Sequence, residues 1–202
     1  MNTFHARATA AMLALSMALG GIVLARCEKA EPIRTDEGAS VVVDNELLAF
    51  LSLARARHHE ANLLEQNGDV PGAINALQKI VDAPKPYPGR RLPEVEEVLA
   101  DTYARMAELK LGNKDVAGAR HDVETGLLHV TDPTYFRGHL LEVYGIVEEA
   151  RTADLRDAGD DVEADKARQH ALSLLREAVD VQEAVIGRVL DGGPKSGMDG
   201  AR

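Results

Sequence analysis

Two segments of this chain read almost alike: Asp69-Val70-Pro71-Gly72-Ala73 and, 46 residues further on, Asp115-Val116-Ala117-Gly118-Ala119. Each lies between two stretches in which apolar residues recur every three or four positions, the spacing of one face of an α-helix. A repeated helix–turn–helix segment of this kind is typical of proteins that stack pairs of helices. Such proteins usually bind other proteins, so the sequence indicates a type of task without identifying a partner.

The composition of the 202-residue chain fits a helical core. Hydrophobic residues make up 45% of the sequence, with three Phe, four Tyr and no Trp. The Ala- and Leu-rich remainder favours helix formation and close helix packing. The formal net charge of -10 disfavours nucleic acid as a partner, because phosphates are bound by clustered Lys and Arg.

Five of the six expected helices have a recognisable start. An aspartate before a helix can accept a hydrogen bond from its first free amides, and a proline fits the first helical turn. The starts are Asp44, Asp69, Pro93, Asp115 and Asp132-Pro133. We therefore predict an all-α domain over 44–190, built from three antiparallel helix pairs.

The ends of the helices are marked by residues that tolerate a left-handed backbone. Asn67-Gly68 and Gly112-Asn113 follow the first and third helices, and Gly159-Asp160 follows the fifth. Three prolines make 83–92 a rigid connector between the first two pairs. Residues 191–202 contain little that could be buried, so we expect a disordered tail.

The N-terminus differs from the rest of the chain. Residues 8–25 are uncharged and apolar, between Arg7 and Arg26, which is typical of an export signal or a short membrane anchor. We therefore expect residues 1–26 to direct the chain out of the cytoplasm. The polar segment 27–43 would then act as a flexible tether.

The only cysteine follows this segment directly. Leu24-Ala25-Arg26-Cys27 resembles the lipoprotein box of bacterial envelope proteins, which implies acylation of Cys27. Arg26 departs from that pattern, which has a small residue before the cysteine. Two alternatives stay open: cleavage after Ala25, giving a soluble secreted protein, and an uncleaved membrane anchor.

The helical region resembles the tetratricopeptide repeat family, in which small residues of paired helices pack together and bulky residues follow. Ala61 and Ala107 fit the small position of the first helix. The second helix matches at Ala73 with Leu77, and at Ala119 with Val123. In the third pair the same spacing is kept by Ala171, Leu175 and Ala178. The resemblance implies a short α-solenoid, although the spacings of 46 and 52 residues between the second-helix alanines exceed the family's usual period.

In that family the first helices line a concave face that holds a peptide. The resemblance places Arg55, His59, Glu108 and Glu148 there as exposed candidates. Arg90-Arg91, in the proline-rich connector, is interpreted as a solvated loop tip.

The sequence offers little chemistry. It has no phosphate-binding Gly-Lys-Ser/Thr loop, no HExxH and no nucleophile elbow. The acidic residues between 154 and 165 are explained by helix capping and solvation, without a metal. We therefore expect no enzyme activity and no cofactor.

The leading hypothesis is a protein-interaction adaptor, tethered in a bacterial cell envelope with its helical domain on the exported side. The alternative is an architectural helical spacer or a self-assembling envelope subunit.

Overall fold

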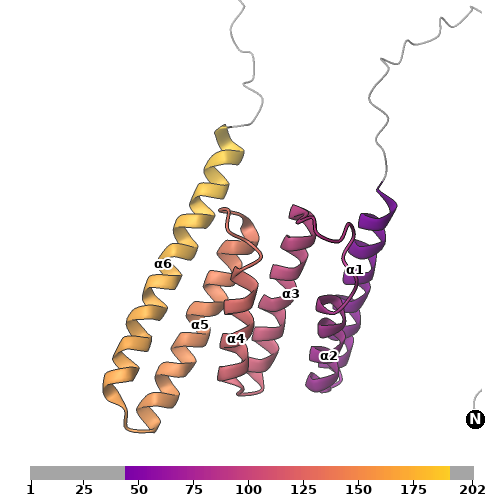
Figure 1. Cartoon of the computed structure of the whole chain (residues 1–202). Helices are drawn as coiled ribbons and strands as arrows, with labels where there is room; N and C mark the ends of the chain where they lie inside the picture. The colour runs from indigo at the N-terminus through magenta and orange to yellow at the C-terminus, as the bar shows by residue number, and fades with distance from the viewer. Residues whose placement is uncertain (1–43, 192–202) are drawn as a thin grey trace, which may run out of the picture. The chain divides into compact units, whose positions relative to one another are not determined.

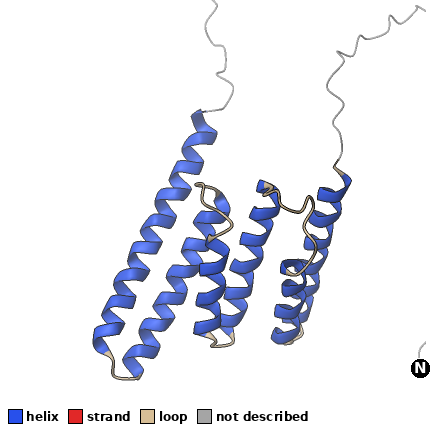
Figure 2. Ribbon diagram, viewed as in Figure 1, coloured by secondary structure: helices blue, strands red, loops and turns tan. Residues whose placement is uncertain are grey.

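The computed structural model describes residues 44–191, with side chains to residue 188, and this part contains six α-helices and no strand (Figure 1, Figure 2). The predicted all-α fold class is confirmed. The helices are α1 (Asn45–Gln66), α2 (Val70–Val81), α3 (Pro93–Gly112), α4 (Val116–Leu127), α5 (Tyr135–Asp157) and α6 (Asp161–Asp191). The predicted signal or anchor, the tether with Cys27 and residues 192–202 lie outside the described residues.

The turn inside each pair is built in the same way. The side chain of Asp69 accepts a hydrogen bond from the Gly72 amide at 2.9 Å, and Asp115 accepts one from Gly118 at the same distance. Asp160 repeats the arrangement before α6. Each bond satisfies an amide that has no partner within its helix, which sets the first residue of the second helix of each pair.

The residue before each of these aspartates has a left-handed backbone. Gly68 and Gly159 have φ values of 79°, and Lys114 has a φ of 65°. Lysine is an uncommon residue in this region, because its Cβ approaches the backbone. The third turn therefore follows the geometry of the first two, although its sequence echo is weak.

The three pairs stack in chain order (Figure 1). Consecutive first helices contact each other, α1 with α3 and α3 with α5. Each second helix contacts the next first helix, α2 with α3 and α4 with α5, whereas within the described region no contact joins one second helix to another. This arrangement is a short helical solenoid in which the first helices share one face.

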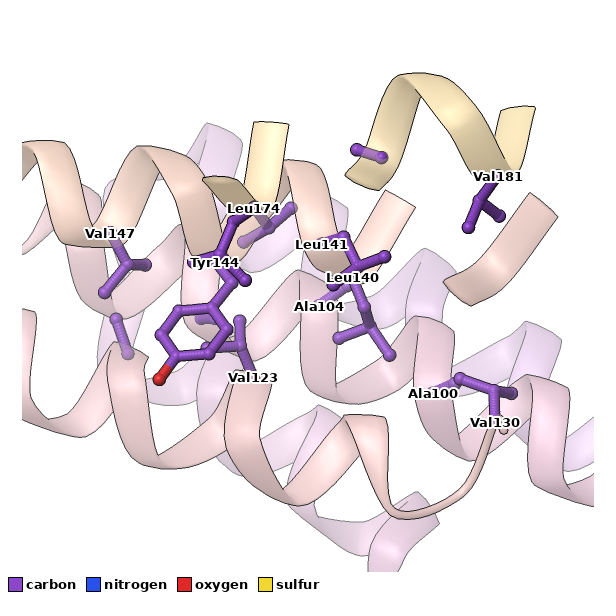
Figure 3. Close-up of a cluster of buried hydrophobic side chains, with 14 residues drawn as sticks. Ala100, Ala104, Val123, Val130, Leu140, Leu141, Tyr144, Val147, Leu174 and Val181 are labelled. Atoms are coloured by element: carbon purple, nitrogen blue, oxygen red, sulfur yellow. The ribbon is translucent and has the colours of Figure 1, made fainter. Parts of the chain in front are cut away.

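The buried core forms two clusters that meet at α3. One side of α3 packs against α1 and α2 through Leu99 and Met106, and the other side packs against α4 and α5 through Ala100 and Ala104. Small residues on the second side let the helix backbones approach closely. The second cluster continues through Leu140 and its neighbours to α6 (Figure 3).

The residues predicted to pack the repeats lie inside these clusters or beside them. Eight of the nine are buried: Ala61, Ala73, Leu77, Ala107, Ala119, Val123, Ala171 and Ala178. The ninth, Leu175, is half-buried and lies against the backbone of Gly145 in α5.

The register of the third pair differs from the one inferred from sequence. Asp69 and Asp115 lie 46 residues apart, and the third cap, Asp160, follows 45 residues later. Ala164, which is fully buried, therefore holds the position of Ala73 and Ala119. The sequence prediction assigned Ala171 to this position from apolar spacing alone. The repeat is thus nearly regular, without the 52-residue spacing.

The start of α5 also differs from the prediction. Asp132-Pro133 was expected to cap and open this helix, but the cap is Thr134, whose hydroxyl accepts a hydrogen bond from the Arg137 amide. Thr134 has the extended backbone of a helix cap, with φ -119° and ψ 166°. The proline therefore lies outside the helix.

Candidate protein-binding face

The face shared by α1, α3 and α5 carries three of the four residues that sequence placed there. Arg55 and His59 are exposed on α1, and Glu108 on α3 is half-buried. Glu148 is wrong as an exposed candidate: it is fully buried, with 0% of its surface accessible. Charged side chains are seldom buried completely unless they are paired, and Glu148 is paired.

Polar contacts tie α1 to α3 along this face. The His58 Nε2 atom lies 3.1 Å from the Thr102 hydroxyl and 3.9 Å from the Asp101 carboxylate. A second contact joins Arg105 of α3 to Glu65 of α1. Burial lowers the pKa of His58, although Asp101 opposes this effect.

The link from α3 to α5 is an imidazole held between two carboxylates. The His139 ring lies 3.6 Å from Glu108 and 4.0 Å from Asp101, and it stacks on Tyr135 with ring centres 5.9 Å apart. The separation from Glu108 is that of an ion pair rather than a hydrogen bond. The Glu108 carboxylate raises the pKa of His139, and burial opposes it only in part. The charged form of His139 therefore stabilises the packing of α5 on α3.

The α1 part of the face is basic and unpaired. Within the described residues Arg55 and His59 form no ion pair, and with Ser52 and Ala56 they line a depression of about 480 Å³. On α3 the residue in register with Arg55 is Asp101, which already contacts His58 and His139. Arg55 and His59 on α1 are therefore charged groups of this face that remain available for a partner.

The interlocked residues on α3 and α5 were missed by sequence reasoning. Asp101, Arg105 and His139 look like ordinary solvated residues of amphipathic helices. The repeat spacing nevertheless indicates that Asp101 belongs to this face. Asp101 lies 46 residues after Arg55, the distance that separates the two repeated segments. Applying that distance to the first helix would have placed Asp101 on the shared face.

Glu148 lies at the junction of α4, α5 and α6. Its carboxylate is 3.0 Å from the Arg120 Nε atom, 3.0 Å from an Arg151 guanidinium nitrogen and 3.5 Å from His170 Nδ1. The Tyr144 hydroxyl donates a hydrogen bond of 2.8 Å to Glu124. Two guanidinium groups already neutralise the Glu148 carboxylate, so its role is to hold three helices together.

Tyr144 connects this ionic cluster to the hydrophobic core. Its ring lies beside Val123 (Figure 3) and meets the His170 ring edge-on, with centroids 5.2 Å apart. Burial and the hydrogen bond to Glu124 raise the pKa of Tyr144, so its hydroxyl remains a donor at neutral pH. The ring is therefore part of the packing between α4, α5 and α6.

Arg91 is not a free residue of the connector. Its guanidinium donates to Glu96 at 2.6 Å and to the Leu128 carbonyl at 3.0 Å, and the Glu96 carboxylate also lies 2.9 Å from His129 Nδ1. These contacts fasten the start of α3 to the loop after α4. Arg91 is exposed, as the sequence predicts, but it also makes these tertiary contacts, which the sequence did not indicate; Arg90 is exposed and lies over the Tyr87 ring at 5.4 Å.

The fold and this face define an all-α protein of stacked helix pairs. Comparison of the chain with family models, with curated proteins and with solved structures finds no match. Among the helices between residues 44 and 191, none is long and apolar enough to cross a membrane.

Proposed function

We propose that this protein is a non-enzymatic interaction scaffold of the tetratricopeptide-like type, which holds a protein or peptide on the face shared by its first helices. The single observation that carries the proposal is the difference between the helices of this face. Asp101 and Glu108 on α3 are engaged with His139 on α5, whereas Arg55 and His59 on α1 are exposed and unpaired within the described residues.

The chemistry of the face suggests the chemistry of the partner. A guanidinium group and an imidazole one helical turn apart can bind a carboxylate from two directions. The same side chains beside a shallow depression offer no nucleophile–base pair and no enclosed pocket for a reaction. We therefore expect an acidic segment of a protein partner to lie over α1.

The location belongs to the same proposal. The uncharged segment 8–25 and Cys27 support a scaffold tethered in a cell envelope, with residues 27–43 as the link between the membrane and the helices. In this arrangement the helical domain is on the exported side.

The test is affinity capture of the full chain from gently solubilised native membranes. Arg55→Glu with His59→Glu reverses the basic group on α1. The matched control, Asn75→Glu with Lys79→Glu, changes two exposed residues of α2 with the same spacing and the same change in formal charge when His59 is counted as neutral. A stoichiometric partner that is lost from the first variant and kept by the control supports the proposal. A partner kept by both variants would refute binding at α1.

A further inference from the structure

An apolar groove runs along the end of the stack, between α5 and α6. Leu172 of α6 is 44% exposed, and Val179 and Ile186 of the same helix are exposed as well. Leu175 lies in the floor of this groove, which contains hollows of about 350 and 360 Å³. In Figure 1 α6 is the last helix of the row.

The equivalent grooves inside the chain are filled. The groove between α1 and α2 receives α3, and the groove between α3 and α4 receives α5. In repeat register Leu172 holds the position of Val81 and Leu127, which pack against the two core clusters. The exposure of Leu172 therefore results from the lack of a following first helix among the described residues.

At the opposite end of the stack, α1 exposes apolar side chains that correspond to buried side chains on α3. Helix α3 packs on the first pair through one face that includes Leu99 and Leu109, both buried. The residues in the same register on α1 are Leu53 and Leu63, which are 38% and 48% exposed. The helix face that enters a groove is thus present on α1, and residues 44–191 contain no preceding pair to receive it.

Opposite charges replace apolar residues at the two ends. Glu60 of α1 holds the register position of Met106, and Arg168 of α6 holds that of Leu77 and Val123. Met106 and Leu77 belong to the same buried cluster. In the described region Arg168 forms no ion pair, and Glu60 pairs only with its neighbour Arg57. The end faces therefore match in shape and in charge.

We propose that copies of this chain associate head to tail, with α1 of one copy entering the groove between α5 and α6 of the next. The contact repeats the packing of α3 on the first pair, and it places Glu60 beside the partner's Arg168. Because the two surfaces differ, the contact is heterologous, and unmodified copies form chains or rings rather than a two-fold symmetric dimer. Ser52 and Ala56, which line the depression on α1, are in register with Val98 and Thr102 of α3, so this contact covers part of that depression.

The experiment measures the mass of the full chain in mild detergent, by sedimentation velocity over a range of concentrations. Leu172→Asp disables the groove and Leu53→Asp disables the α1 face. Each variant alone is expected to lose self-association by about tenfold or more in affinity. An equimolar mixture of the two variants is expected to form a 1:1 dimer, because each variant keeps the surface that the other lacks.

Two controls make the result specific. Val162→Asp changes an exposed apolar residue of α6 that does not line the groove, and it is expected to leave association unchanged. Glu60→Arg and Arg168→Glu each weaken association, and the doubly reversed chain regains it. Circular dichroism confirms that each variant is folded.

Either of two results would overturn the proposal. One is an unmodified chain that remains monomeric at every concentration. The other is a dimer that is lost in Leu172→Asp and kept in Leu53→Asp, since this pattern indicates that the grooves of two copies face each other.

Discussion

The Nε atom of Arg120 in α4 lies 3.0 Å from the carboxylate of Glu148 in α5, and that carboxylate is completely buried. Glu148 is in repeat register with Tyr103 and Arg57, so the third pair places an acid where the earlier pairs have larger side chains. A buried acid requires compensating charge, which Arg120 and Arg151 provide. The junction of the last two pairs therefore depends on ionic contacts as well as on apolar packing.

Glu148→Ala should destabilise the domain strongly. Loss of the carboxylate leaves two guanidinium groups without their partner and opens space in the core, so we expect a loss of about 3 kcal/mol in the free energy of unfolding. Urea denaturation followed by circular dichroism measures this value. The control is Glu149→Ala, an exposed neighbour expected to change stability by less than about 0.5 kcal/mol. Equal effects of the two substitutions would contradict the buried ionic junction.

Gly126→Ala should destabilise the contact between α4 and α5. An added Cβ would lie 2.8 Å from the Leu140 Cδ2 atom and 2.9 Å from the Tyr103 Cβ atom, so backbone or side chains must shift. We expect a cost of about 1–3 kcal/mol in thermal or urea denaturation.

Gly112→Ala is the matched control for this prediction. It is also a helical glycine, but an added Cβ there meets nothing within 4 Å. Because alanine favours a helix over glycine, we expect unchanged stability or a gain of up to about 1 kcal/mol. If both alanine variants behave alike, the close approach at Gly126 is incorrect.

The caps of the second helices should contribute equally. Asp69→Ala and Asp115→Ala each remove one hydrogen bond to an otherwise free amide, and each should cost about 1 kcal/mol. Asp69→Asn keeps an acceptor oxygen and should retain most of the stability. The two alanine effects should add, since the turns share no partners. A strongly unequal pair of values, measured by urea denaturation, would count against the common turn geometry.

The fold could be predicted largely because its signals are local. Asp69 and Asp115 cap the helices that follow them directly in sequence, so each helix start can be predicted from neighbouring residues. In the structure α2 and α4 begin immediately after these two caps. The start of α5 was missed because Asp132 and Thr134 can both cap a helix, and sequence alone does not rank them. The register of the third pair was missed because Ala171 was assigned from apolar spacing, although counting from the predicted turn at Gly159-Asp160 leads to Ala164.

The candidate face was harder to predict for a physical reason. Whether Glu148 is buried depends on Arg120, 28 residues away in sequence, and on the rotation of α5 about its axis. The same applies to His139, whose two acidic neighbours belong to α3. Apolar spacing defines which side of a helix is buried, but it does not reveal charged residues that are buried as pairs.

Two histidines on this face should give opposite pH dependences. Folding raises the pKa of His139 because of Glu108, so its stabilisation is complete below the ordinary value of 6.5 and is lost as pH rises through the folded pKa. Burial lowers the pKa of His58, so its contribution is present above 6.5 and is lost as pH falls.

Glutamine variants measured at two pH values test this pair. His139→Gln should cost more stability at about pH 5.5 than at about pH 8.5, and His58→Gln should cost less at about pH 5.5 than at about pH 8.5. Urea denaturation of each variant beside the unmodified chain gives the four differences. The same trend for both variants would disprove the assigned surroundings of one histidine.

The measurement that tests the scaffold most directly is site-specific photo-crosslinking in living cells. A photoreactive amino acid replaces Arg55 on the shared face in one variant and Asn75 on the exposed side of α2 in the other. The proposed function predicts a cross-link from position 55 to one defined protein and no cross-link to that protein from position 75. Cross-linking to the same protein from position 75 and not from position 55 would contradict binding on the face of the first helices.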